Sequence, residues 1–150
     1  MDLETVGAAE FGASLRGIGL NLLVRDVAAQ CKFLRSVFGI VAHQQTVDFA
    51  ILTYGDQVFQ IHSDGTYHSN PLLGLVPETP PRGGGIEIRL YDTPPDDACA
   101  RVEAQGGTIL QPPTDKPHGL REAYILCENG YAWVPSQPLS RAKATSDPGN

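Results

Sequence analysis

Polar side chains that can bind or transform a small molecule alternate with apolar ones in two short stretches, residues 58–62 and 86–91. Successive side chains of a β-strand point to opposite faces, so in each stretch the polar residues share one face and the apolar residues share the other. The apolar faces are expected to pack on helices, which turns the polar faces away from the core. The polar set is Gln60, His62, Glu87, Arg89 and Tyr91.

These residue types support more than one kind of chemistry. A carboxylate such as that of Glu87 can pair with a cationic ligand, or it can act as a general base while Arg89 or His62 holds a developing oxyanion. The same pattern is typical of a sheet with one face in water. Glu87 and Arg89, about 7 Å apart between Cα atoms on one strand, can also simply neutralise each other.

Further candidates lie outside these stretches. His118, in a predicted loop next to Arg121, can gate a pocket or bind an anionic group together with Arg121, although a loop His-Gly pair is more often a turn. Trp133 alternates with Tyr131 and is either a core residue or a stacking surface for a flat ligand.

Composition narrows the classes of protein to consider. The chain has 150 residues, 41% hydrophobic and 19% charged, which is typical of a globular domain. Its net charge of −6 and the absence of a Lys/Arg cluster do not favour nucleic acid as a partner. No apolar run approaches the length of about 18 residues that predicts a membrane-spanning helix. The first twelve residues lack the basic side chains of a secretory signal, and three widely spaced cysteines without a CxxC motif favour a reducing cytoplasm.

A similar order of elements occurs twice. Residues 17–22 (GIGLNL) and 85–90 (GIEIRL), 68 positions apart, carry apolar side chains at the same alternate positions and are predicted strands. Each is followed by a predicted helix and then by three strand-like stretches, with Asn129-Gly130 as a hairpin turn in the second copy. Each copy therefore has the order βαβββ, which predicts an α+β fold built by internal repetition.

The two predicted helices have recognisable boundaries. Apolar residues follow helical spacing over 26–38, and Gly39 ends this helix. In the second copy, Pro94-Pro95 marks a helix start, and the pair Gly106-Gly107 marks its end, with Gly107 at the same offset of 68 from Gly39.

Local motifs accompany the repeat. They are LLVRDV at 22–27, FL at 33–34, FG at 38–39, KPHGLRE at 116–122 and NGY at 129–131. Together with the repeated unit, these motifs resemble the vicinal oxygen chelate superfamily, which includes glyoxalase I, bleomycin-resistance proteins and extradiol dioxygenases. The resemblance covers residues 17–139. It implies tandem βαβββ modules that form one cupped mixed sheet around a cavity, with helices outside, and it does not by itself imply one reaction.

The resemblance also assigns positions to the four metal ligands found in enzymes of this superfamily. The first corresponds to Gly19, which has no side-chain donor, and the second to Gln60. The third corresponds to Glu87, or to Ile86 if the alignment shifts by one residue, and the fourth to Val134. At most two positions therefore carry a donor, whereas a catalytic metal usually has about three protein ligands. We expect no cofactor, while a divalent metal at a non-standard site of His62, Glu87 and Gln60 stays open as an alternative.

The expected function follows from the incomplete set of metal ligands and from the negative net charge of the chain. By resemblance to the bleomycin-resistance proteins, we expect a metal-independent protein that binds an aromatic or cationic small molecule in the cup. The alternatives are a lyase, isomerase or dioxygenase with a non-standard metal site or with Glu87 as general base, and an interaction domain with a vestigial pocket. The expected binding residues are Gln60, His62, Glu87, Arg89, Tyr91, Arg121 and Trp133. The resemblance further implies a homodimer.

The expected domain organisation is simple. A flexible segment over 1–16 precedes the domain at 17–139, and a flexible tail follows over 140–150. Within the domain, modules at about 17–62 and 85–136 are joined by a linker at 63–84 that is rich in proline and glycine.

Overall fold

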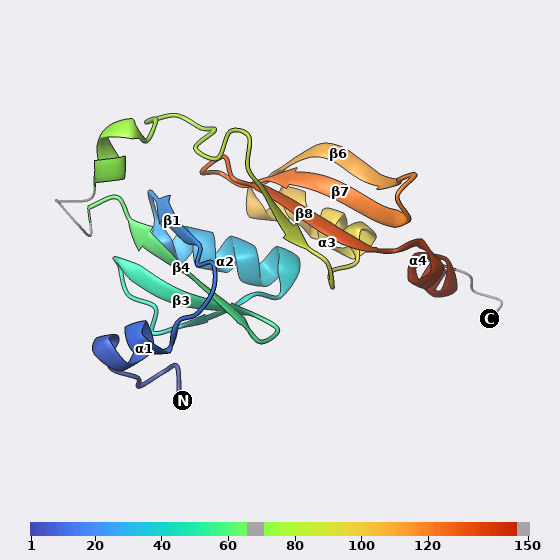
Figure 1. Cartoon of the computed structure of the whole chain (residues 1–150). Coiled ribbons are helices and arrows are strands. Elements are labelled where there is room, and N and C mark those ends of the chain that lie inside the picture. Colours follow the sequence, from blue (N-terminus) through green and yellow to red (C-terminus); the bar gives the residue numbers. More distant parts are fainter. Residues whose placement is uncertain (66–70, 147–150) are drawn as a thin grey trace. The chain divides into compact units, whose positions relative to one another are not determined.

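A computed structural model of the chain describes residues 1–65 and 71–146 (Figure 1). Residues 66–70 and 147–150, which belong to the predicted linker and tail, lie outside the described residues. The chain divides into two compact units, Met1–Arg35 with Gly39–Val76, and Ser36–Phe38 with Pro77–Asn150. Among the described residues, no helix has both the length and the apolar character needed to cross a membrane.

Unit 1 contains the four-stranded sheet A. Its elements are α1 (Ala8–Ser14), β1 (Asn21–Val24), α2 (Val27–Phe38, whose last turn is grouped with unit 2), β2 (Val41–His43), β3 (Phe49–Tyr54), β4 (Gln57–Ser63) and the 3-10 helix η1 (Pro71–Leu75). The strand order is β1-β4-β3-β2, with β1 parallel to β4 and the other neighbours antiparallel.

Unit 2 repeats this topology in sheet B. Its elements are β5 (Glu87–Leu90), α3 (Pro95–Val102), the 3-10 helix η2 (Glu103–Gln105), β6 (Thr108–Asp115), β7 (Leu120–Leu126), β8 (Ala132–Pro138) and α4 (Leu139–Ser146). The strand order is β5-β8-β7-β6, and β5 is parallel to β8. The predicted α+β class and the repeated βαβββ order are confirmed. The strands are hydrogen-bonded as two sheets of four, one in each module.

The boundaries of both helices have local physical causes. The Asp26 side chain accepts a hydrogen bond of 3.0 Å from the Ala29 amide, which caps the start of α2. Gly39 ends α2 with a φ of 71°, a left-handed conformation that costs glycine little. In unit 2 the glycine in this role is Gly106, with a φ of 78°, which ends η2 and belongs to the predicted Gly106-Gly107 pair.

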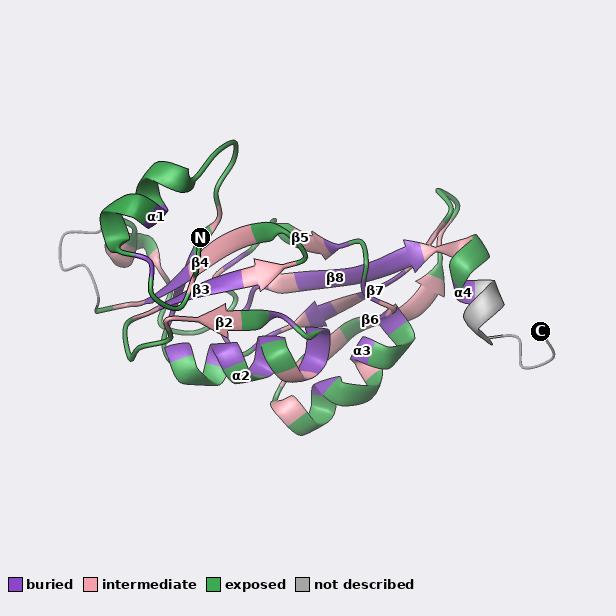
Figure 2. Cartoon of the chain, turned by 90° about the horizontal axis from the view of Figure 1, so that it is seen from below, coloured by how far each residue is buried: buried purple, intermediate pink, exposed green. Residues whose placement is uncertain are grey.

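Alternation separates two faces of sheet A. Ala50, Leu52 and Ile61 are fully buried on the face toward α2. The opposite face, which we call the distal face of sheet A, carries Phe49, Ile51, Val58, Gln60 and His62, which are paired across β3 and β4. Figure 2 shows α1 and α2 on opposite sides of this sheet.

The N-terminal segment, residues 1–16, packs on the distal face of sheet A. This segment, predicted to be flexible, includes α1, and its Val6 and Phe11 are buried against Ile51. At the other end of the chain, the predicted flexible tail begins in helix α4, where Ala142 is buried.

Sheet B separates its faces in the same way. Ile125 and Trp133 are cross-strand partners and are fully buried on the face toward α3, and the long strand β8 is almost wholly buried in Figure 2. The opposite face, the distal face of sheet B, carries Glu87 and Arg89 from β5 and Glu122 and Tyr124 from β7.

Candidate functional site

Charged side chains from two strands converge on the distal face of sheet B. Arg89 Nη1 donates a hydrogen bond of 3.1 Å to Glu87 Oε2 on the same strand. Its Nη2 donates to Glu122 Oε2 on β7, across the intervening strand β8. One guanidinium thus binds two carboxylates, so the three groups carry a formal charge of −1.

Three further side chains complete the cluster. His118 Nε2, from the loop before β7, lies 3.4 Å from Glu122 Oε2. Tyr124 forms a hydrogen bond with Glu87, and the ring of Tyr91 lies 5.5 Å from the Arg89 guanidinium carbon, within cation–π range. Glu122 is only 2% exposed, whereas Glu87 is 42% exposed and His118 is 55% exposed. Glu122 is therefore the buried member of the cluster, and a ligand can contact Glu87 and His118 from solvent.

The hydrogen bonds fix the ionisation of the cluster. The Tyr124 hydrogen bond lowers the pKa of Glu87 below its ordinary value, and Arg89 lowers it further against the opposing effect of burial. Burial lowers the pKa of Arg89, but the hydrogen bonds and charges of Glu122 and Glu87 outweigh it and raise this pKa. Glu87 is therefore anionic at neutral pH. Its lowered basicity makes it a poor general base at neutral pH.

An apolar pocket of about 720 Å³ opens beside this cluster. Glu87 is itself one of the lining residues, so the pocket and the charged groups form one continuous surface. The other lining residues are Pro81, Gly83, Gly84, Gly85, Ile86, Leu110, Leu126, Gly130 and Ala132. Ile86 and Leu110 are more than half exposed, and large apolar side chains in that state favour contact with a ligand.

Two of the expected binding residues lie elsewhere in unit 2. Arg121 sits in β7 on the face toward α3, where its guanidinium pairs with Asp96 at 2.8 and 2.9 Å and with Asp115 at 2.8 Å. Trp133 is fully buried and paired with Ile88 and Ile125. The structure does not bring either residue together with Glu87 and Arg89.

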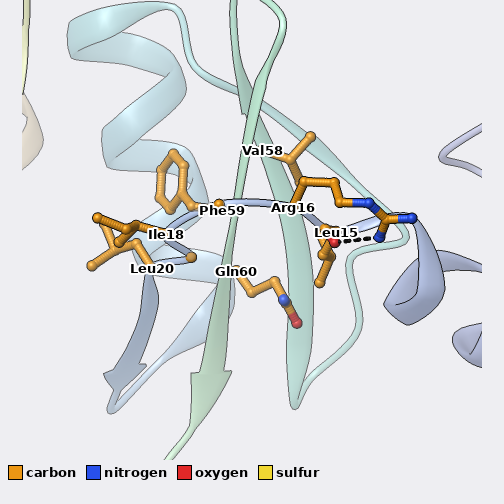
Figure 3. A pocket seen from close by; sticks show the side chains of 9 residues that line it. Leu15, Arg16, Ile18, Leu20, Val58, Phe59 and Gln60 are labelled. Carbon is orange, nitrogen blue, oxygen red and sulfur yellow. Dashed lines mark hydrogen bonds between the residues drawn. The ribbon is translucent and has the colours of Figure 1, made fainter.

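Gln60 and His62 lie on β4 in unit 1. Gln60 lines a smaller pocket of about 300 Å³ between β4 and residues 15–20 (Figure 3). The His62 ring is nearly buried and lies 5.0 Å from the ring of Phe49, and burial lowers the pKa of His62. His62 is therefore neutral at pH 7.

The comparisons with known proteins fit this topology. A family model described as the Glyoxalase/Bleomycin resistance protein/Dioxygenase superfamily matches residues 18–134. The chain belongs to this superfamily. No curated protein matches the chain.

Solved structures of low identity share the superfamily fold. A glyoxalase/bleomycin resistance protein/dioxygenase family enzyme from Burkholderia phytofirmans PsJN has a TM-score of 0.67 at 18% identity, covering 80% of this chain and 96% of that one. TioX from Micromonospora sp. ML1 has a TM-score of 0.60 at 22% identity, covering 81% and 95%. A glyoxalase-related enzyme from Fulvimarina pelagi has a TM-score of 0.64 at 18% identity, covering 82% and 88%. At these identities the likeness concerns the fold alone.

The residues at the superfamily's metal positions do not fit a divalent ion. Gly19 offers no donor, and Val134 is apolar and fully buried. Glu87 is already held by Tyr124 and Arg89, and Gln60 is a neutral amide. Within 1–65 and 71–146, no group of three or more His, Cys, Asp and Glu side chains is placed to hold a metal ion.

Sequence reasoning missed part of this candidate site. Glu122 and Tyr124 were not considered, although Glu122 contacts both Arg89 and His118. His118 was considered only as a pocket gate or as a partner of Arg121 in binding an anion. One signal was present, because a glutamate within the apolar strand 120–126 implies a buried charge that needs a partner. Ser136 lies opposite Glu122 and is fully buried, and among the described residues its hydroxyl has no hydrogen-bond partner.

Proposed function

We propose that this protein binds, without a metal, a small molecule that has an aromatic or apolar body and a positive charge, on the distal face of sheet B. The observation that carries the proposal is the position of Glu87, whose carboxylate belongs to the charged cluster and also lines the apolar pocket. A ligand with an apolar body and a positive charge can therefore place its body in the pocket and its charge beside the Glu87 carboxylate.

The charge of the cluster sets the preferred sign of the ligand. Glu87 and Glu122 share one guanidinium, and the lowered pKa of Glu87 keeps it ionised at neutral pH. A cation bound at Glu87 neutralises the formal charge of −1 on Glu87, Glu122 and Arg89, whereas an anion is repelled by this charge. The exposed Tyr91 ring beside Arg89 adds a face on which an aromatic body can stack.

A second candidate is general acid–base catalysis in an isomerase or lyase reaction. Glu122 is buried beside His118, and a buried carboxylate that accepts from one imidazole nitrogen leaves the other nitrogen available as a base. This arrangement favours His118 over Glu87 as the proton acceptor, since the hydrogen bonds to Glu87 reduce its basicity.

Matched fluorescent probes of opposite charge test the binding proposal. We expect 9-aminoacridine, a cation at neutral pH, to bind at least about tenfold more tightly than acridine-9-carboxylate, a difference of about 1.4 kcal/mol. Glu87→Gln is expected to remove this preference. The exposed Glu103 lies outside the cluster, so Glu103→Gln is the matched control and is expected to leave it unchanged. Equal affinity for the two probes, or no binding of either below 1 mM, contradicts the proposal.

Two further properties are proposed from the resemblance and the composition. We expect a homodimer, which light scattering after size-exclusion chromatography measures directly. We also expect a cytoplasmic location, supported by three free cysteines, of which Cys31 and Cys127 are buried.

A further inference from the structure

The N-terminal segment occupies the distal face of sheet A in the way a ligand occupies a site. Val6 and Phe11 are buried against Ile51. Leu3 from the segment and Phe49 and Val58 from the sheet complete this apolar cluster. The face beneath the segment is therefore an apolar surface that the chain itself covers.

A polar cradle beside this surface receives the carboxylate of Glu4. One carboxylate oxygen lies 2.6 Å from His43 Nδ1, and the other accepts a hydrogen bond of 3.4 Å from the Gln44 amide. The second ring nitrogen of His43 is held by the Thr53 hydroxyl at 3.1 Å. Sheet A thus offers an oriented imidazole and a backbone N–H to one carboxylate.

The backbone of the cradle is unusual at Gln44. Its φ of 49° makes it the one residue other than glycine with a positive φ in the part of the chain that the structure describes. This conformation points the Gln44 amide at Glu4, and the Gln44 side chain donates hydrogen bonds of 2.9 Å to the carbonyls of Leu3 and Val6. Because a non-glycine residue rarely adopts this conformation, its presence at a polar cradle favours a binding role.

The connection between the segment and β1 is open to solvent. Residues 15–19, which follow α1, are all exposed. Gly17 has a φ of 70°, and a Cβ atom added at Gly17 or Gly19 would meet no atom within 4 Å. Helix α1 has seven residues, no side-chain cap and one buried side chain, Phe11. A helix of this length is not stable alone, so its order depends on docking.

We propose that the N-terminal segment is a displaceable lid, and that the face beneath it is a second binding site for an apolar carboxylate. In the closed state Glu4 takes the place of the ligand's carboxylate at His43 and Gln44, and Phe11 takes the place of its apolar body on Ile51. This site is built from sheet A and its polar groups are donors, whereas the proposed cation site is built from sheet B and its polar groups include two carboxylates.

The ligand class follows from the groups the lid presents. The cradle supplies N–H donors, which select an anion, and the planar pair of oxygens on Glu4 engages two of them. The neighbouring surface is aliphatic and aromatic, so an aromatic or long-chain carboxylate matches both parts. A free ligand competes with the lid, and its apparent affinity falls by the fraction of molecules in which the lid is open.

The probe for this test is 1-pyrenebutyrate, with 1-pyrenemethylamine as the matched cation. Phe11→Ala weakens lid docking, and we expect it to bind pyrenebutyrate at least about tenfold more tightly than the unsubstituted chain. Glu4→Gln, at an exposed position that does not threaten folding, is expected to shift affinity in the same direction. His43→Leu in the Phe11→Ala background is expected to abolish the gain.

Hydrogen exchange distinguishes binding that displaces the lid from binding at another place on the protein. Saturating pyrenebutyrate is expected to speed amide exchange in residues 1–16 of the full chain, including the Phe11 amide that donates to the Gly7 carbonyl. Circular dichroism confirms that each variant is folded. The proposal is overturned if folded Phe11→Ala and Glu4→Gln bind pyrenebutyrate no more tightly than the unsubstituted chain. It is also overturned if exchange in residues 1–16 does not change on binding, or if pyrenemethylamine gains equally.

Discussion

Arg89 on β5 donates a hydrogen bond to the buried carboxylate of Glu122 on β7, so this pair reaches across the strand β8 that separates their own strands. The link joins β5 and β7 through their side chains, although the backbone ladder does not pair these two strands directly. The same guanidinium donates to the exposed carboxylate of Glu87, so the position of the Glu87 side chain depends on the hydrogen bond between Arg89 and Glu122.

Removal of Arg89 is expected to destabilise unit 2 strongly. Arg89→Leu leaves the Glu122 carboxylate buried without its partner, at a cost of about 3 kcal/mol in the free energy of unfolding. The double variant Arg89→Leu/Glu122→Leu is expected to lose less than Arg89→Leu alone, because no uncompensated charge remains. Urea denaturation monitored by circular dichroism measures both. A double variant less stable than the single one contradicts this account of the pair.

The lowered pKa of Glu87 predicts a wide pH range for cation binding. An ordinary glutamate has a pKa of 4.5, and the Tyr124 and Arg89 hydrogen bonds move that of Glu87 below this value. Affinity for 9-aminoacridine is therefore expected to stay constant from pH 7 down to about pH 5 and to fall only below the ordinary glutamate range. Fluorescence titrations at half-unit steps measure this profile.

Tyr124→Phe provides the matched variant for that profile. It removes the largest cause of the lowered Glu87 pKa while keeping the ring, so loss of binding is expected to begin at a higher pH. An unchanged profile in Tyr124→Phe would show that Tyr124 does not set the ionisation of Glu87.

Features that depend on neighbours in the sequence were predictable. The Asp26 cap and the Gly39 end of α2 act within a few residues, and the alternation in β5 placed Glu87 and Arg89 on one face. These features gave the βαβββ order, which the strand pairing confirms. The end of the second helical stretch was predictable too, because Gly106, from the expected Gly106-Gly107 pair, takes the left-handed position after η2.

Features that depend on long-range register were not predictable. Glu122 meets Arg89 only because β8 inserts between β5 and β7 in a fixed register, which no local pattern reveals. Arg121 was expected in a loop, but β7 begins at Leu120, so alternation turns Arg121 toward Asp96 on α3. Phe11 gave no sequence signal for docking, because its partner Ile51 is forty residues away and on another element.

His62 predicts a loss of stability in mildly acidic solution. Burial lowers its pKa in the folded chain below the ordinary value of 6.5, so the unfolded chain takes up the proton first as the pH falls. The free energy of unfolding is therefore expected to decrease as the pH drops from 7 through 6.5 toward the folded pKa. His62→Leu is expected to make this decrease shallower in urea titrations at pH 7.0, 6.0 and 5.5. Equal slopes for both proteins would contradict the prediction.

Trp133 and Tyr91 are expected to respond in opposite ways. Trp133 is fully buried on the face toward α3, so Trp133→Ala is expected to cost about 3–5 kcal/mol of stability. The milder Trp133→Phe is expected to preserve the fold and to leave the affinity for 9-aminoacridine unchanged.

Tyr91 is 55% exposed beside Arg89, so Tyr91→Ala is expected to weaken binding of 9-aminoacridine about fivefold with little change in stability. Parallel titrations and urea melts of the two variants decide between a core role and a stacking role for each ring. Weaker binding by a stable Trp133→Phe would place the ligand on the α3 side of sheet B and contradict the proposed site.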